Sequence, residues 1–105
     1  MANQILLDVL GNKIRLTDER RNHILQHAEL TGHFDWLAET LAGPEKIIQS
    51  TQDENAHLYY AYKRQSAVGD KWLCVVVKFS AEDAFVVTAY LTDKIKTGVA
   101  LWPKP

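Results

Sequence analysis

The chain has 105 residues, of which 47% are hydrophobic and 24% are charged, and its formal net charge at pH 7 is -1. This length and composition fit one globular domain with its own core and exclude a second domain of ordinary size. The balance of 12 basic against 13 acidic residues excludes a protein that coats nucleic acid through bulk positive charge. It leaves room for a small basic cleft.

The predicted location is the cytoplasm. The N-terminal residues lack the basic segment and long apolar stretch of a signal peptide. The longest apolar run, residues 73–77, is too short to span a bilayer, so no membrane association is expected. The one cysteine, Cys74, cannot form an internal disulfide and is expected to lie in the core.

The first half of the chain predicts a β-hairpin followed by two helices. Residues 5–10 and 13–16 are strand-like and are separated by a Gly-Asn turn. Thr17 is a predicted N-cap of a helix that we expect to run to about Leu30. A second, shorter helix is expected over residues 34–41, ending before Pro44. Pro44 can also begin one further helical turn.

The second half predicts strands. Residues 58–63, 72–79 and 84–92 are rich in β-branched and aromatic side chains and are separated by polar connectors, which is typical of an antiparallel meander. The order of elements predicts an α+β fold in a single domain of residues 1–105. An N-terminal β-hairpin and two helices are expected to pack on a mainly antiparallel C-terminal sheet.

One candidate set of functional residues lies on the first predicted helix. Arg20, His23 and His27 follow one another at intervals of three and four, which places them along one helix face. Cleavage of a phosphodiester needs a proton acceptor, a proton donor and a cation, which imidazole and guanidinium groups supply. The alternative is that these residues pack or are solvated. A zinc site is not expected, because His23 is not followed by glutamate and no cysteine pair is present.

A second set lies on the last predicted strand. Because side chains alternate across a strand, Thr88, Tyr90 and Thr92 share one face with the residue at 86, opposite the apolar side chains at 85, 87, 89 and 91. If the apolar face packs on the helices, the hydroxyls point outward in a row. Threonine and tyrosine are also favoured in strands for packing reasons alone.

Lysines and a tyrosine extend this second set. Lys78 lies on the preceding strand, and Lys94 and Lys96 follow the last one. Lysines beside hydroxyl groups predict a phosphate-binding site. Lysines at strand ends also serve solubility. Near Trp72, the sequence also has Tyr59, Tyr60 and Tyr62, which can stack on unpaired RNA bases or pack across strands. Of these, Tyr60 is the substrate-binding candidate.

Several sequence segments together resemble the barnase–EndoU–colicin–RelE-like (BECR) nuclease group of phages and mobile elements. The resemblance covers about residues 14–102 and is carried by LTDERRNHILQHAEL, ETLAGPEKIIQS, YYAYKR, KWLCVVVKF and FVVTAYLTDKIKTG. It implies a metal-independent ribonuclease fold, with helices followed by a four-stranded antiparallel sheet, that is often used as a toxin. The helix motif falls on Arg20, His23 and His27, and the strand motif on Thr88, Tyr90 and Thr92, followed by Lys94 and Lys96.

The first hypothesis is therefore a metal-independent endoribonuclease, the toxin of a toxin–antitoxin or mobile-element system. His27 or His23 would act as general base or acid, and the other residues would hold or orient the phosphate: Arg20, Lys78, Tyr90 and Thr88. The RNA's own 2′-hydroxyl would attack, and no cofactor is expected. The alternative is a catalytically inactive protein-binding or regulatory module with the same fold.

The expected partners are RNA, an antitoxin or another protein, and a second copy of the chain paired through an exposed sheet edge. The surface separates the two hypotheses. Clustering of the predicted cations around one concavity favours the enzyme, and scattering of these cations favours the binding module.

Overall fold

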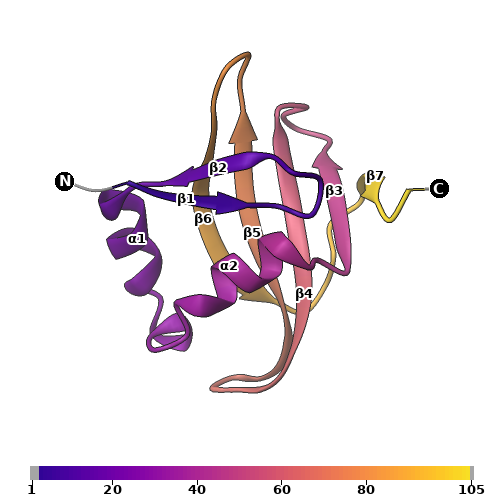
Figure 1. The fold of residues 1–105 in the computed structure, drawn as a ribbon. Coiled ribbons are helices and arrows are strands. Elements are labelled where there is room, and N and C mark those ends of the chain that lie inside the picture. Colours follow the sequence, from indigo (N-terminus) through magenta and orange to yellow (C-terminus); the bar gives the residue numbers. More distant parts are fainter. Residues whose placement is uncertain (1–2, 105) are drawn as a thin grey trace.

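The computed structural model describes residues 3–104, which form a seven-stranded sheet with helices on one side (Figure 1). The helical segments are α1 (Asp18–Leu25), the 3-10 helix η1 (Ala28–Leu30) and α2 (Asp35–Ala42). The strands are β1 (Gln4–Leu7), β2 (Lys13–Leu16), β3 (Lys46–Ser50), β4 (Ala56–Ser66), β5 (Gly69–Phe79), β6 (Ala84–Thr92) and β7 (Gly98–Trp102). The predicted α+β fold with an N-terminal hairpin and a mainly antiparallel sheet is confirmed.

The strand order is β1-β2-β6-β5-β4-β3-β7. Neighbouring strands are antiparallel, except that β2 runs parallel to β6, where Arg15 lies opposite Phe85. The β1–β2 hairpin turns out of the plane of the other strands and crosses in front of them beside α2 (Figure 1). A backbone hydrogen bond of 2.9 Å from the Val9 N–H to the Leu41 carbonyl joins the hairpin to α2.

The main core lies between this covering layer and the inner face of the sheet. The hairpin, the helices and the strands all contribute apolar side chains to it because each has one apolar face. Its buried members are Leu6, Ile14, Leu16, Ile24, Leu30, Leu37, Leu41, Ile47, Tyr59, Leu73, Val75, Val77, Ala84, Val86 and Ala89. We call this group the inner core.

A buried carboxylate ties the hairpin tip to the sheet. Asp8 is 6% exposed and accepts a 2.5 Å hydrogen bond from the Tyr59 hydroxyl of β4. It also accepts hydrogen bonds from the backbone N–H groups of Leu10 and Asn12 and from the Asn12 side chain. Burial, together with the bond to this carboxylate, raises the pKa of Tyr59. Four donors thus satisfy a carboxylate that would otherwise be costly to bury.

The outer face of the sheet carries a second, smaller cluster. Its buried members are Ile48, Leu58, Tyr60 and Cys74, and the partly buried side chains packed on them are Trp72, Val76, Tyr90 and Ile95. We call it the outer cluster. Ile95 belongs to the connection from β6 to β7, residues 93–97, which we call the crossing segment. The strand order requires this segment to pass over β5, β4 and β3.

The predicted end of the first helix was wrong. The first helix ends at Leu25, and a 3-10 turn follows, whereas one helix to Leu30 was expected. Ile24 and Leu30 are both fully buried in the inner core. In a continuous helix their side chains would point about 120° apart, so the chain unwinds to bury both.

The helical turn expected after Pro44 is strand β3. Ile47 lies in the inner core and Ile48 in the outer cluster, an alternation across two buried faces that a strand satisfies and a helical turn does not. Strand β7 was not predicted.

Gly98 marks a close approach between β7 and β3. A Cβ added there would lie 2.3 Å from the Gln49 carbonyl oxygen and 2.6 Å from Ile48 Cγ2. We expect Gly98→Ala to lower the free energy of unfolding by about 1–3 kcal/mol, because the backbone must shift to admit the methyl group. Urea unfolding measures the change. Val99→Ala, at an exposed position of the same strand, should change it by less than about 0.5 kcal/mol. Equal losses in the two variants would contradict the close approach.

Candidate nucleic-acid interface

The predicted helix set lies on and just after α1. The Thr17 hydroxyl oxygen caps α1 by accepting the Arg20 N–H at 3.1 Å, as predicted. His23 lies in the last turn, and His27 lies beyond the helix at the start of η1. The two imidazole rings still meet edge to face, with centroids 6.1 Å apart. His27 Nδ1 lies 3.8 Å from a Glu29 carboxylate oxygen.

The predicted strand set lies on the outer face of β6. Thr88, Tyr90 and Thr92 lie opposite residues 76, 74 and 72 of β5, all of which belong to the outer cluster. The expected alternation thus holds for these three side chains. It fails at Val86, which lies in the inner core, because a bulge opposite the Val76–Val77 step inserts one extra residue into β6.

The structure does not bring the two sets together. α1 packs against β6 from the inner side and buries Ile24 there, whereas Tyr90 packs on the outer cluster. Within residues 3–104, no hydrogen bond, ion pair or ring contact joins Arg20, His23 or His27 to the strand set. The two sets therefore form no shared cleft through direct contacts.

The predicted lysines fall into two groups. Lys78 forms a 3.0 Å ion pair with Asp53 of the β3–β4 loop, and this bond lowers the pKa of Asp53. Lys94 and Lys96 are exposed on the crossing segment, and neither forms an ion pair with another residue in the described range 3–104. Of the three predicted lysines, the two without an ion pair are thus those of the crossing segment.

Tyr60 cannot stack on a base as expected, because it is fully buried. The crossing segment covers it, and its hydroxyl oxygen accepts the Lys96 backbone N–H at 3.1 Å. Tyr60, Cys74 and Tyr90 form a row of direct partners across β4, β5 and β6. Burial raises the pKa of Tyr60 to about 12 and also raises those of Cys74 and Tyr90, so the row is neutral near pH 7. The expected core position of Cys74 is confirmed.

Aromatic side chains are accessible further along the same face. Tyr62 of β4 lies opposite Trp72 of β5, with ring centroids 5.0 Å apart and an interplanar angle of 68°. Tyr62 is 38% exposed, and the Arg64 guanidinium lies 5.9 Å from its ring centroid. Lys46 of β3 is exposed and shares the outer face, because it pairs with Tyr60. We call Lys46, Tyr62, Arg64 and Trp72 the aromatic patch.

The charges of the aromatic patch are available to a ligand. Neither Lys46 nor Arg64 forms an ion pair within residues 3–104. The neighbouring Glu45 carboxylate accepts the Tyr62 backbone N–H at 2.5 Å. Alternation along β4 puts Tyr60 and Tyr62 on one face, but only the path of the crossing segment decides which of them is covered. Of the three tyrosines expected to stack on bases, Tyr59 and Tyr60 are buried, and Tyr62 alone is accessible.

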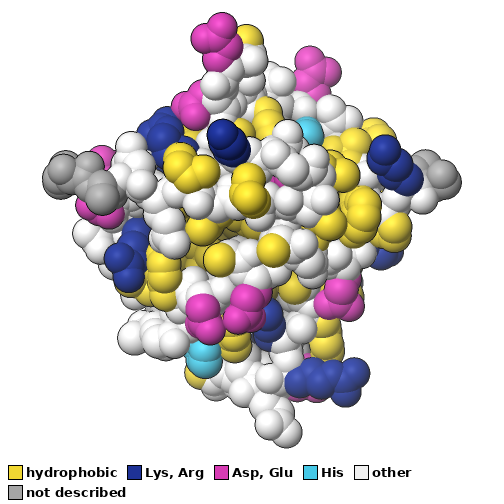
Figure 2. Space-filling model, viewed as in Figure 1, with side chains coloured by type: hydrophobic (Ala, Val, Ile, Leu, Met, Phe, Trp, Pro, Cys, Tyr) yellow, Lys and Arg dark blue, Asp and Glu magenta, His cyan; other side chains and the backbone are white. Residues whose placement is uncertain are grey.

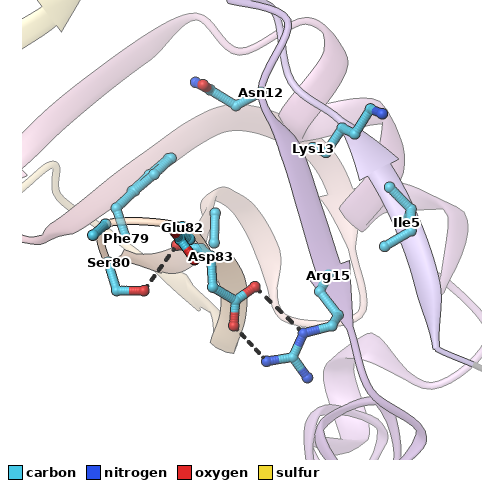
Figure 3. A pocket seen from close by; sticks show the side chains of 10 residues that line it. Ile5, Asn12, Lys13, Arg15, Phe79, Ser80, Glu82 and Asp83 are labelled. Atoms are coloured by element: carbon cyan, nitrogen blue, oxygen red, sulfur yellow. Dashed lines mark hydrogen bonds and ion pairs between the residues drawn. The ribbon is translucent and has the colours of Figure 1, made fainter.

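Two hollows lie near the ends of the strands. The larger, of 410 Å³, lies between the hairpin and the β5–β6 turn, where Arg15 and Asp83 point toward one another and form a 2.7 Å ion pair (Figure 3). The smaller, of 270 Å³, is lined by Ser50, Thr51, Gln52, Leu58, Lys96 and Thr97. Lys96 is the one residue of the predicted site that lines either of these two hollows.

On the face that carries the hairpin and helices, basic side chains are dispersed among acidic and apolar ones (Figure 2). Among residues 3–104, no group of three or more His, Cys, Asp and Glu side chains is arranged to hold a metal ion. No helix in that range has the length and hydropathy needed to cross a membrane. Comparison of the chain with protein-family models, curated proteins and solved structures gave no match.

The Arg15–Asp83 pair predicts a pH-dependent stability. The hydrogen bond from Arg15 lowers the pKa of Asp83 below its ordinary value of 3.8. Asp83 therefore stabilises the fold above pH 3.8, and this contribution is lost as the pH falls through the lowered pKa. We expect Asp83→Asn to unfold at lower urea concentration than the wild type at pH 7 and at the same concentration near pH 2. The control is Glu82→Gln, the neighbouring exposed carboxylate, which should show no such pH trend. If Asp83→Asn still unfolds at a lower urea concentration than the wild type at pH 2, by the same margin as at pH 7, the ion pair is not the cause.

Proposed function

We propose that this chain binds single-stranded RNA at the aromatic patch on the outer face of its sheet. The observation that carries the proposal is the partly exposed Tyr62–Trp72 ring pair flanked by Lys46 and Arg64. Unpaired bases stack on aromatic rings, and cations beside the rings hold the phosphates between them. We expect this RNA binding to take place in the cytoplasm.

The charge of the chain limits how this binding can work. With a net charge of -1, the chain cannot gain affinity from a broad basic surface, so stacking must supply a large share of it. If Lys46, Arg64 and Lys96 each neutralise one phosphate, the slope of log K against log salt is roughly -2. Such weak salt dependence distinguishes this interface from that of a strongly basic RNA-binding protein.

Replacement of Tyr62 tests the stacking contribution. Because stacking is worth about 1–3 kcal/mol per base, Tyr62→Ala should weaken binding of a labelled oligouridylate about 5-fold to 150-fold. Fluorescence anisotropy measures the affinity. The matched control is Val68→Ala, which alters an exposed side chain on the same β4–β5 hairpin. If the two variants bind equally well, the aromatic patch is not the site.

Replacement of Arg64 tests the phosphate contact. Arg64→Gln should make the salt slope shallower by about 0.7, the value for one lost phosphate contact on a single strand. Lys13→Gln removes an exposed cation of the hairpin and should leave the slope unchanged. A slope that shifts equally in both variants would indicate a general charge effect in place of a site.

A second candidate, the metal-independent endoribonuclease, is supported by the His23–His27 pair. Two imidazoles 6.1 Å apart, with Arg20 on the same helix, can supply a proton acceptor, a proton donor and a cation around one phosphodiester. Attack by the RNA's own 2′-hydroxyl would leave a cyclic phosphate. The resemblance to BECR nucleases supports this chemistry and implies an antitoxin as protein partner. Since Thr88 and Tyr90 do not contact the histidines, the helix set would act without them.

Incubation with total RNA and tRNA in EDTA tests the second candidate. We expect the wild-type chain to produce fragments ending in a cyclic phosphate and His27→Ala to produce none. His33→Ala should behave like the wild type, because His33 lies apart from the pair and stacks on Trp36 at 3.8 Å. Intact RNA in every lane, with oligouridylate still bound, would leave an RNA-binding module without catalysis.

A further inference from the structure

We infer that the 270 Å³ hollow between the β3–β4 loop and the crossing segment binds a phosphate group. It is lined by Ser50, Thr51, Gln52, Leu58, Lys96 and Thr97. We call it the phosphate hollow. That the phosphate belongs to RNA rests on the proposed function, whereas the chemistry of the hollow does not depend on it.

The backbone holds the lining residues in place from three directions. Ser50 ends β3 and pairs with Gly98, and the close approach at Gly98 brings the neighbouring Thr97 against the end of β3. The Lys96 N–H bonds to the Tyr60 hydroxyl, which fixes the crossing segment over β4. Leu58, which is 5% exposed, supplies a buried apolar floor. Ser50 and Leu58 of the sheet thus form the base of the hollow, and a loop and the crossing segment form its walls.

The lining offers hydrogen-bond donors and a cation. The Ser50 hydroxyl oxygen accepts the Gln52 backbone N–H at 3.2 Å, which leaves its own hydrogen free to donate. Within residues 3–104, the hydroxyls of Thr51 and Thr97 have no hydrogen-bond partner. Hydroxyls, an amide and an ammonium group match the acceptor oxygens of a phosphate.

The local charge also favours an anion. No carboxylate lines the phosphate hollow. Of the two acids in the adjoining loop, Asp53 is neutralised by Lys78, and Glu54 is exposed. Lys96 is exposed, and its positive charge opposes the rise in the pKa of Cys74 that burial causes. A lysine without an ion-pair partner within residues 3–104 thus lines the same hollow as three hydroxyl-bearing side chains.

Size and position indicate what kind of ligand fits. The volume of 270 Å³ lies just below the range of about 300–1,000 Å³ typical of drug-sized ligands, so the hollow suits a single group such as phosphate. Leu58 and Tyr62 lie on the same face of β4, four residues or roughly 13 Å apart. One strand of about four stacked nucleotides spans that distance. Because the crossing segment covers Tyr60 between these two positions, a short RNA that occupies both the phosphate hollow and the aromatic patch passes over this segment.

The first test uses inorganic phosphate and amide chemical shifts. At constant ionic strength set with chloride, phosphate should shift the amides of Ser50, Thr51, Gln52 and Thr97 saturably. Lys96→Gln should weaken phosphate binding about tenfold or more, because it removes a charge-assisted hydrogen bond. Lys94→Gln, on the same segment but outside the hollow, should stay within about twofold of the wild type. Unaltered amide spectra away from the hollow verify that each variant is folded.

Absence of saturable shifts, or equal weakening by the two lysine variants, would overturn the inference. The second test compares oligouridylates with and without a 5′-phosphate. Tighter binding of the phosphorylated strand, lost in Lys96→Gln, would identify RNA as the source of the phosphate. RNA binding that depends on Tyr62 without any phosphate effect would remove this inference and leave the proposed function intact. Phosphate binding without RNA binding would leave the inference about the phosphate hollow intact and remove the proposed function.

Discussion

The arrangement of the whole chain depends on how the N-terminal hairpin is held over the sheet. Within residues 3–104, β2 meets β6 at one residue pair, so strand pairing alone attaches the hairpin weakly. The Asp8 carboxylate provides the second attachment, at the far end of the hairpin, through its bond to Tyr59. With both ends fixed, the hairpin covers the inner core beside the helices. That coverage leaves the outer face of the sheet to the crossing segment and to solvent.

As a consequence, the candidate functional residues are divided between the covering layer and the outer face of the sheet. His23, His27 and Arg20 lie with the covering layer. The predicted strand residues Thr88, Tyr90 and Thr92, and the lysines of the crossing segment, lie on or around the outer face. The two sets share no contact, which favours recognition at the outer face over chemistry that requires both. If cleavage occurs, it belongs to the imidazole pair, and the sheet contributes only binding. The dispersed charges of the hairpin side agree with recognition at a local patch.

Local patterns in the sequence predicted much of this architecture because they act over a few residues. Alternation along β6 placed Thr88, Tyr90 and Thr92 on one face, and the cap at Thr17 marked the start of α1. Patterns of this kind do not report contacts between distant segments. The early end of α1 follows from burying Leu30, which only the folded core requires.

The candidate site was harder to predict for the same reason. Tyr60 and Tyr62 have equivalent positions in the alternation of β4, and they differ only in that the crossing segment covers Tyr60. Ser50 and Thr97 are separated by 46 intervening residues, yet they become neighbours through the Ser50–Gly98 pairing of β3 with β7. A strand that was not predicted thus determines which hydroxyls surround Lys96.

The crossing segment is also a short connection whose length limits the distance between β6 and β7. From Thr92 to Gly98 the chain has six steps, which reach roughly 20–22 Å when fully extended. The four strand spacings between β6 and β7 amount to about 19 Å. The segment must therefore be almost fully extended to join these two strands. A connection this short draws β6 and β7 toward each other on the outer side and limits how far the five strands from β6 to β7 can flatten. Removal of a single residue from it would therefore alter the curvature of the sheet, and with it both surfaces that border the segment.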